Sequence, residues 1–215
     1  MLRRQFLGSV SAGLTVGALA RPVLGAPIFE DTVEVNRDYY LVSRVVMPKQ
    51  PNRTLVEVFS YGCPHCAALE PKLPVLLAQV PKDSKFGLLP VIFAPEQEAY
   101  ARAFYAAQNL GILGKSHAAL FREVAAKGRA SWSIEQLARE FYSQYGVDAR
   151  TFEQEALSTS VSQSIARGAA LAQAYGIDQT PTFVVSGQYR VVIKDDSIAS
   201  LHRSAIVISR LLEAR

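Results

Sequence analysis

Cysteine is scarce in this 215-residue sequence, which contains only Cys63 and Cys66. Neither residue can pair with another thiol in a structural disulfide, and no second pair is available to complete a four-cysteine zinc site. Methionine is equally scarce: Met1 and Met47 are the only two, so no thioether cluster suggests copper binding. Any sulfur chemistry of the protein therefore takes place at the single Cys-Pro-His-Cys motif.

The sequence also lacks a strong excess of charge once its first residues are set aside. The net charge is +4, but residues 1–26 contain three arginines and no acidic residue, so the remainder carries only about +1. No run of interleaved basic and aromatic residues suggests a groove for a nucleic acid. We therefore expect no nucleic-acid partner.

Residues 1–26 predict an export signal peptide. Arg3 and Arg4 precede a Phe-Leu pair and a short stretch rich in Gly and Ala, which is too short for a convincing membrane span. Adjacent arginines followed by Phe-Leu resemble the twin-arginine signal, and a general secretory signal is the alternative. Either route predicts a periplasmic protein, and disulfides persist in that compartment.

In an oxidising compartment, Cys63 and Cys66 form either a static disulfide or a centre of disulfide exchange. Closing a loop of two residues removes little chain entropy, so a static disulfide here would stabilise the fold only weakly. Exchange needs a thiolate, and a helix predicted to start at Pro64 would place unpaired N–H groups and a positive dipole end beside Cys63. The exchange interpretation is therefore favoured.

The hydrophobic pattern predicts an α/β chain interrupted by a helical stretch. The helix from Pro64 should be kinked or restarted at Pro71 and Pro74, and a last helix should span about 196–213. Strands are expected at 39–47, 54–59, 86–93, 182–185 and 188–193.

The stretch 95–175 differs from its flanks because it lacks strand alternation and has helical spacing of apolar residues. Two helix starts in it carry capping-box signatures: Ser133 with Gln136, and Thr151 with Gln154.

The segment 58–66 with the segment 180–187 resembles the DsbA type of periplasmic thiol–disulfide oxidoreductase, in the thioredoxin superfamily. The resemblance implies a thioredoxin fold, a central mixed β-sheet flanked by helices, with an inserted all-helical subdomain. Residues 27–94 and 176–215 are then expected to form the thioredoxin-like domain, and residues 95–175 the insertion. We expect no cofactor and no metal ion.

The same resemblance gives each residue of the motif a role. Cys63 is expected to be the accessible cysteine that forms the mixed disulfide, and Cys66 the buried, resolving thiol. Pro64 begins the helix, and His65 is expected to stabilise the thiolate rather than simply face solvent.

Thr180 and Pro181 are expected to face the disulfide. The resemblance implies a cis Thr180–Pro181 bond, whereas the sequence alone would suggest a trans proline at a strand start. The Thr180 backbone would then bind an extended substrate peptide. His117 and His202 lack the spacing of ligands and are expected to be ordinary helix residues.

Two acidic residues are candidates for tuning the cysteines or moving protons. Glu57 lies within an apolar strand, where the resemblance implies a buried acid, and exposure at a sheet edge is the alternative. Glu70 lies one helical turn beyond the motif, and a solvated helix carboxylate is its alternative. The nearest basic candidates to pair with Glu57, Lys82 and Lys85, do not fall clearly into register with it.

The favoured interpretation is an exported dithiol oxidase that donates its disulfide to reduced, unfolded proteins. The resemblance implies a membrane partner of the DsbB type that reoxidises the enzyme, and we expect a monomer. A disulfide isomerase or reductase on the same fold is the first alternative. A non-enzymatic metal-binding or chaperone module is the second.

Overall fold

The computed structural model describes residues 32–42, 53–127, 132–195 and 197–214. The predicted export signal, and positions 43–47 of the first predicted strand, lie outside these residues. Residues Val33–Arg215 form one compact unit, and the division of this unit at residues 95 and 175 stays a proposal.

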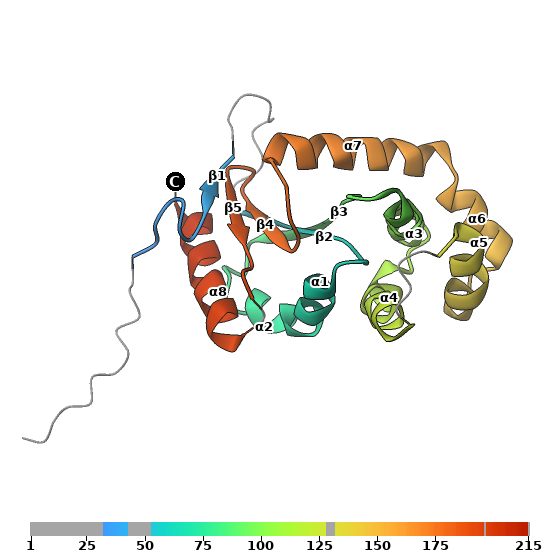
Figure 1. Cartoon of the computed structure of the whole chain (residues 1–215), viewed down its shortest axis with the longest axis horizontal. Helices are drawn as coiled ribbons and strands as arrows, with labels where there is room; N and C mark the ends of the chain where they lie inside the picture. Colours follow the sequence, from blue (N-terminus) through green and yellow to red (C-terminus); the bar gives the residue numbers. More distant parts are fainter. Residues whose placement is uncertain (1–31, 43–52, 128–131, 196, 215) are drawn as a thin grey trace, which may run out of the picture. The chain divides into compact units, whose positions relative to one another are not determined.

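A mixed sheet, five-stranded within the described residues, has the order β1-β5-β4-β2-β3 (Figure 1). β2 and β3 are parallel, and the other neighbours are antiparallel. This is the predicted thioredoxin-like arrangement, a mixed sheet with helices on both sides. The strands are β1 (Tyr40–Leu41), β2 (Thr54–Phe59), β3 (Lys85–Pro90), β4 (Thr182–Val185) and β5 (Tyr189–Val192).

The hairpin between β4 and β5 turns at Ser186 and Gly187. Both residues have positive φ, 50° and 66°, which is the backbone of a two-residue hairpin turn whose twist matches the flanking strands. The turn falls between the strands predicted at 182–185 and 188–193.

Helices cover both faces of the sheet, with α7 on one face and α1, α2 and α8 on the other (Figure 1). Among the described residues, no helix is both long and apolar enough to cross a membrane. The first group is α1 (Pro64–Leu69), the 3₁₀ turn η1 (Glu70–Lys72), α2 (Leu73–Leu77) and α8 (Ile198–Glu213). Those between β3 and β4 are η2 (Pro95–Gln97), α3 (Glu98–Asn109), α4 (Leu113–Lys127), α5 (Ile134–Gln136), η3 (Leu137–Phe141), η4 (Tyr142–Tyr145), α6 (Ala149–Ala156) and α7 (Thr159–Tyr175).

Alternation along β2 divides the core between these two faces. Leu55 packs with residues of α1, α2 and α8, whereas Val58 packs with Tyr175 of α7. Phe59 continues the first face into a third, aromatic cluster formed with the helices between β3 and β4. Glu57 has the same parity as Leu55 and Phe59, so its side chain lies on the face covered by α1.

The first helix is interrupted, as its prolines predict. α1 ends at Leu69, a single 3₁₀ turn carries Glu70, and α2 restarts with Pro74 in its first turn. Proline lacks an N–H and its ring collides with the preceding turn, so a continuous helix cannot pass Pro71 or Pro74. The interruption places Glu70 at the bend rather than on an uninterrupted helix face.

Of the two predicted capping boxes, one is confirmed and one is wrong. Ser133 and Gln136 exchange both hydrogen bonds of a capping box. The other helix starts earlier: Asp148 is the N-cap and accepts a hydrogen bond from the backbone N–H of Thr151. Asp is as good an N-cap as Thr, and pattern alone did not separate the two starts.

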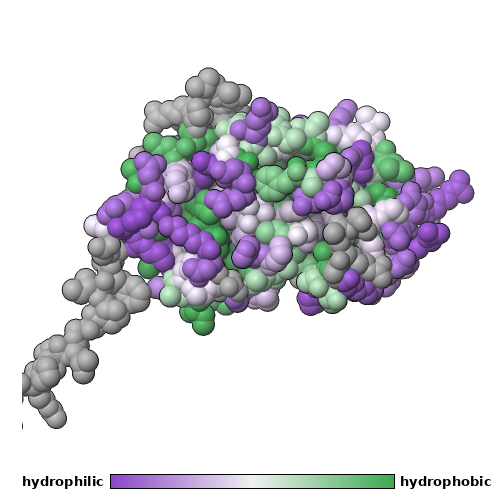
Figure 2. All heavy atoms as spheres, in the orientation of Figure 1, coloured by the Kyte–Doolittle hydropathy of each residue, from purple (hydrophilic) through white to green (hydrophobic). Residues whose placement is uncertain are grey.

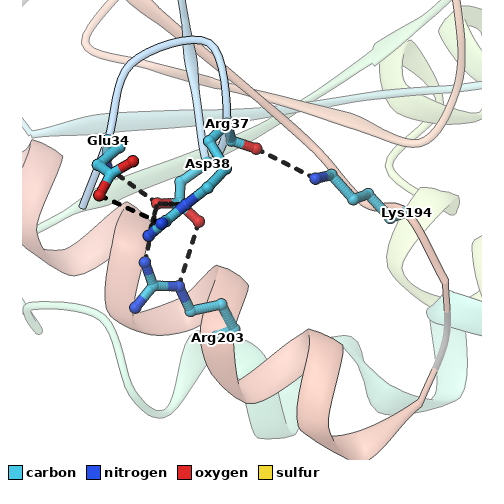
Figure 3. Close-up of polar contacts among 5 residues, drawn as sticks. All are labelled: Glu34, Arg37, Asp38, Lys194 and Arg203. Carbon is cyan, nitrogen blue, oxygen red and sulfur yellow. Dashed lines mark hydrogen bonds and ion pairs between the residues drawn. The ribbon is translucent and has the colours of Figure 1, made fainter. Parts of the chain in front are cut away.

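An ionic cluster fixes the segment before β1 to α8 (Figure 3). The Arg203 guanidinium donates to both oxygens of Asp38, at 2.8 and 3.3 Å. The Asp38 carboxylate also accepts from the backbone N–H of Glu34 at 2.9 Å, and Lys194 donates to the carbonyl of Arg37 at 3.1 Å. Side chains from three separate parts of the chain therefore meet here.

Candidate active site

Antiparallel pairing of β2 with β4 brings the cysteine motif and Pro181 together. Val58 pairs with Thr182, so the end of β2, which leads to Cys63, lies beside the start of β4. The Thr180–Pro181 peptide bond is cis, as the resemblance implied. The Cys63 thiol donates a hydrogen bond to the Thr180 carbonyl, with an Sγ···O distance of 3.3 Å.

Cys63 is the N-cap of α1, and its backbone has extended φ and ψ of −87° and 117°. Its N–H donates to the carbonyl of Ser60 at 3.0 Å, and Pro64 occupies the first turn, where no N–H is needed. Cys63 is half-buried, whereas Cys66 is completely buried. The expected difference in access between the two thiols is present.

The environment separates the acidities of these two thiols. The pKa of Cys63 is lowered from 9.0 to about 5, first by a hydrogen bond from the Cys66 side chain and further by hydrogen bonds from the Thr180 side chain and from the backbone N–H groups of Cys66 and His65. Burial opposes this shift. The pKa of Cys66 is raised, because it hydrogen-bonds to Cys63 and because it is buried. Cys63 is therefore the thiolate at neutral pH, and Cys66 is the thiol.

Pro64 and His65 are both exposed. His65 acts on Cys63 through its backbone N–H, so the expected contribution of its imidazole ring stays a prediction.

Glu57 is buried, with 1% of its surface exposed. It lies on a strand flanked by β3 and β4, so the sheet-edge alternative is wrong. Its Oε2 has no hydrogen-bond partner among the described residues. Burial, reinforced by the negative charges of Glu70 and Cys63, raises its pKa to about 8. Glu57 thus exchanges a proton close to neutral pH.

No basic residue pairs with Glu57 in the register of the sheet. Its neighbour on β3 is Leu88, whereas Lys85 pairs with Thr54 at the start of β2. Lys82 precedes β3. As predicted, neither Lys82 nor Lys85 lies in register with Glu57.

Glu70 does not have a solvated side chain, and that alternative is wrong. Only 15% of the side chain is exposed, and Oε2 lies 3.7 Å from Nε2 of His117. Burial raises the pKa of Glu70, and the exposed Arg122 opposes this rise.

His117 lies on a helix, as predicted, but it is buried rather than exposed. Its ring is buried in α4, its Nδ1 lies 2.6 Å from the hydroxyl of Tyr61, and it meets Phe59 and Phe121 edge to face. Burial lowers its pKa to about 4. Ligand spacing gave no sign of this, but helical periodicity could have, because His117 shares a face with Leu120, Phe121 and Val124.

His202 agrees with its prediction. It lies exposed on α8 and hydrogen-bonds to Gln79 at 2.8 Å.

The structure has a Cys-x-x-Cys pair at the start of a helix, and a cis-proline loop of a mixed sheet faces this pair. These features define the class of thioredoxin-fold proteins with a redox-active dithiol. Residues 54–204 match the DSBA-like thioredoxin domain family. The chain belongs to this family.

Relatives with this fold agree with the assignment. The chain is 29% identical over 190 residues to the thiol:disulfide interchange protein DsbA of Azotobacter vinelandii, covering 88% of this chain and 87% of the relative. The crystal structure of Pseudomonas aeruginosa DsbA superposes with a TM-score of 0.73 at 28% identity, over 86% of this chain and 95% of that one. The oxidoreductase DsbA from Xylella fastidiosa gives a TM-score of 0.72 at 32% identity, over 82% and 96% of the two chains.

Proposed function

We propose that this thiol–disulfide oxidoreductase donates a Cys63–Cys66 disulfide to reduced, folding proteins. The observation that carries the proposal is the different placement of the two thiols: Cys63 is the half-buried N-cap of α1 against the Thr180 carbonyl, and Cys66 is buried. This placement lowers the pKa of Cys63 and raises that of Cys66. The two cysteines therefore have different roles: a substrate can reach the sulfur of Cys63, and the buried Cys66 is the resolving thiol.

The proposed exchange has two steps that balance in electrons and protons. A substrate thiolate attacks Cys63 Sγ, the Cys63–Cys66 bond breaks, and the electron pair passes to Cys66, which takes up a proton. A second substrate thiolate then attacks the substrate sulfur of the mixed disulfide and expels Cys63 as a thiolate. A leaving thiol with a low pKa departs faster, which suits Cys63 to this position.

The same acidity favours oxidation of the substrate. Stabilising the Cys63 thiolate stabilises the reduced enzyme, and about 1.4 kcal/mol corresponds to roughly 30 mV for a two-electron couple. Since Cys63 is half-exposed, we discount its pKa displacement for solvent screening to about 2–4 kcal/mol, or roughly 40–90 mV.

We further propose that Glu57 and Glu70 adjust proton transfer at the resolving thiol. A carboxyl group with a pKa of about 8 that responds to the charge of Cys63 can hold or release a proton at neutral pH. Cys66 needs a proton when the disulfide opens, and Glu57 lies on the sheet face covered by its helix.

Clients are proposed to bind over the cis-proline loop and the active-site helix. An extended peptide would pair with the Thr180 backbone, and α2, which continues the active-site helix, exposes Val75. Ile198 is also exposed at the start of α8, which packs on α2. On the face seen in Figure 2, hydrophobic patches are interspersed with hydrophilic residues.

The cellular setting is part of the proposal. Residues 1–26 would direct export to the periplasm, preferably by the twin-arginine route, and a DsbB-type membrane protein would reoxidise the dithiol. The enzyme would act as a monomer, with residues 27–94 and 176–215 as the thioredoxin-like domain and residues 95–175 as the helical insertion.

Oxidation of a reduced dithiol peptide tests the function. We expect Cys63→Ser to abolish oxidation, and wild-type oxidation by this variant would refute the catalytic role. Titration of the redox potential against glutathione separates an oxidase from an isomerase or reductase. A potential as low as that of thioredoxin would contradict the oxidase.

A further inference from the structure

Tyr61 and His117 form a buried hydrogen bond close to the cysteine motif. Tyr61 precedes Cys63 by two residues and is 2% exposed, and its hydroxyl lies 2.6 Å from His117 Nδ1. Burial raises the pKa of Tyr61 well above its ordinary value, and burial keeps His117 neutral at physiological pH by lowering its pKa. The phenol therefore keeps its proton and donates it to Nδ1, which leaves the ring hydrogen of His117 on Nε2.

The Nε2 atom of His117 faces a second buried polar atom. Glu70 Oε2 lies 3.7 Å away, and neither atom has a hydrogen-bond partner among the described residues. The separation exceeds a hydrogen bond by about 0.5 Å. A small rotation of Glu70 would satisfy both atoms, and buried polar atoms are rarely left unpaired.

Glu70 connects this pair to the cysteines through charge. Its carboxylate is among the groups that act on Glu57, and Glu57 in turn responds to the thiolate of Cys63. Two charged groups interact with Glu70: the Glu57 carboxyl group on β2 and the Arg122 guanidinium on α4. Tyr61 also responds to the charge of Glu70.

We propose that His117 is a positioning residue for the exchange reaction: its Nε2–H, fixed by Tyr61, holds the Glu70 carboxylate and thereby controls the ionisation of Glu57. A hydrogen bond to a carboxylate favours its charged form. A charged Glu70 keeps the proton on Glu57, where it is available to Cys66. The inference rests on the proposed function, because it assigns this proton to the exchange cycle.

The test is a pH titration of the Glu57 and Glu70 carboxyl carbons by NMR, with the reduced protein and no substrate. His117→Phe keeps an aromatic ring and removes the donor. We expect the pKa of Glu70 to rise by about one unit and that of Glu57 to fall by about half a unit. His117→Gln, which restores an N–H donor, should recover most of both shifts.

Tyr61→Phe gives a second, milder variant, because it removes one oxygen and frees the imidazole tautomer. It should shift both carboxyl groups in the same directions, and it carries the test if His117→Phe does not fold. Tyr175→Phe is the matched control, because Tyr175 is a buried phenol packed with the other face of the sheet.

Unchanged Glu57 and Glu70 titrations in a folded His117→Phe or Tyr61→Phe protein would overturn the proposal. Equal shifts in Tyr175→Phe would also overturn it, since they would indicate a general structural effect. This readout is separate from catalysis: failure of the proposed function would instead appear as peptide oxidation by Cys63→Ser.

Discussion

Cys66 acts on Cys63 in two ways, through its side chain and through its backbone N–H. The side-chain hydrogen bond is the largest cause of the low Cys63 pKa, and substitution of Cys66 removes only that part. The backbone N–H of Cys66 and the contact with Thr180 remain whatever side chain stands at position 66. Thus the two contributions can be separated by experiment.

We predict that Cys66→Ala raises the pKa of Cys63 by about 1–2 units, to a value still below that of a free cysteine. Cys66→Ser is the matched comparison: its hydroxyl restores a donor, so the increase should be smaller. The ultraviolet absorbance of the thiolate against pH measures both. Identical Cys63 pKa values in Cys66→Ala and the wild type would show that the backbone alone supplies the stabilisation.

Glu57 makes the stability of the protein depend on pH with a defined sign. Its folded pKa of about 8 lies above its ordinary value of 4.5. A carboxyl group with a raised folded pKa contributes stability below the unfolded pKa, and that contribution is lost as the pH rises through the folded pKa. The free energy of unfolding therefore falls between these two pH values, because the carboxyl group ionises in the unfolded chain while the folded protein keeps it protonated.

Glu57→Gln removes the ionisation and keeps the shape of the side chain. We predict that the oxidised variant is more stable than the oxidised wild type by about 2–4 kcal/mol near pH 9, and that the difference shrinks toward about pH 4. Urea unfolding at several pH values measures this. A stability difference that does not change with pH would mean that Glu57 titrates normally.

At the scale of elements, the cluster around Asp38 joins the segment before β1 to α8. Hydrogen bonds from Arg203, Glu34 and Arg37 overcome the effect of burial and lower the pKa of Asp38 from 3.8 to about 2. The sign is opposite to that of Glu57: a lowered folded pKa gives stability above the unfolded pKa that is lost as the pH falls through the folded value.

We predict that Asp38→Asn lowers the free energy of unfolding by about 1–2 kcal/mol at neutral pH, because it removes a paired charge from a two-pronged contact with Arg203. The loss should diminish as the pH approaches about 2. Glu34→Gln is a suitable control, since Glu34 lies in the same cluster with its side chain half exposed. An equal loss in both variants would contradict a special role for the Asp38–Arg203 contact.

How far the sequence predicts these elements depends on the range of the interactions involved. The start of α1 at Pro64 and its interruption near Pro71 follow from the covalent structure of proline, which acts locally. The prediction of Thr151 as an N-cap was wrong, because Asp148, three residues earlier, caps the helix instead. Glu70 and His117 are 47 positions apart in sequence, so no local sequence pattern could predict that their side chains lie close together.

At the scale of the whole molecule, the sheet and the cis Thr180–Pro181 bond were predicted by the resemblance. The resemblance rests on two motifs that are distant in sequence and lie at neighbouring strands in this family. The cysteine motif and Pro181 lie in segments that antiparallel pairing of β2 and β4 brings together. The resemblance implied the burial of Glu57, whereas its position within an apolar strand alone left exposure at a sheet edge open. The aromatic surroundings of His117 depend on how α4 packs against the end of β2, which only the folded structure contains.

The redox state should couple to the stability of the entire fold. In the reduced protein the Cys63 pKa is about 5, against 9.0 for an ordinary cysteine. A lowered folded pKa gives stability that is present in full above pH 9 and is lost as the pH falls through about 5. The oxidised protein has no such thiol, and its two-residue disulfide loop constrains the unfolded chain little.

We therefore predict that raising the pH from about 5 to about 9 stabilises the reduced protein relative to the oxidised protein by about 2–4 kcal/mol, after discounting for the half-exposure of Cys63. Glu57 opposes part of this gain up to its pKa of about 8, because the thiolate raises its pKa further in the reduced form. Denaturant unfolding of both redox forms at each pH measures the difference.

The Cys63→Ser, Cys66→Ser double variant removes both thiols and should lose the pH-dependent gain of the reduced protein. If the reduced and oxidised proteins instead keep a constant stability difference across this range, the Cys63 thiolate is not stabilised by the fold, and the basis for a strongly oxidising disulfide is lost with it.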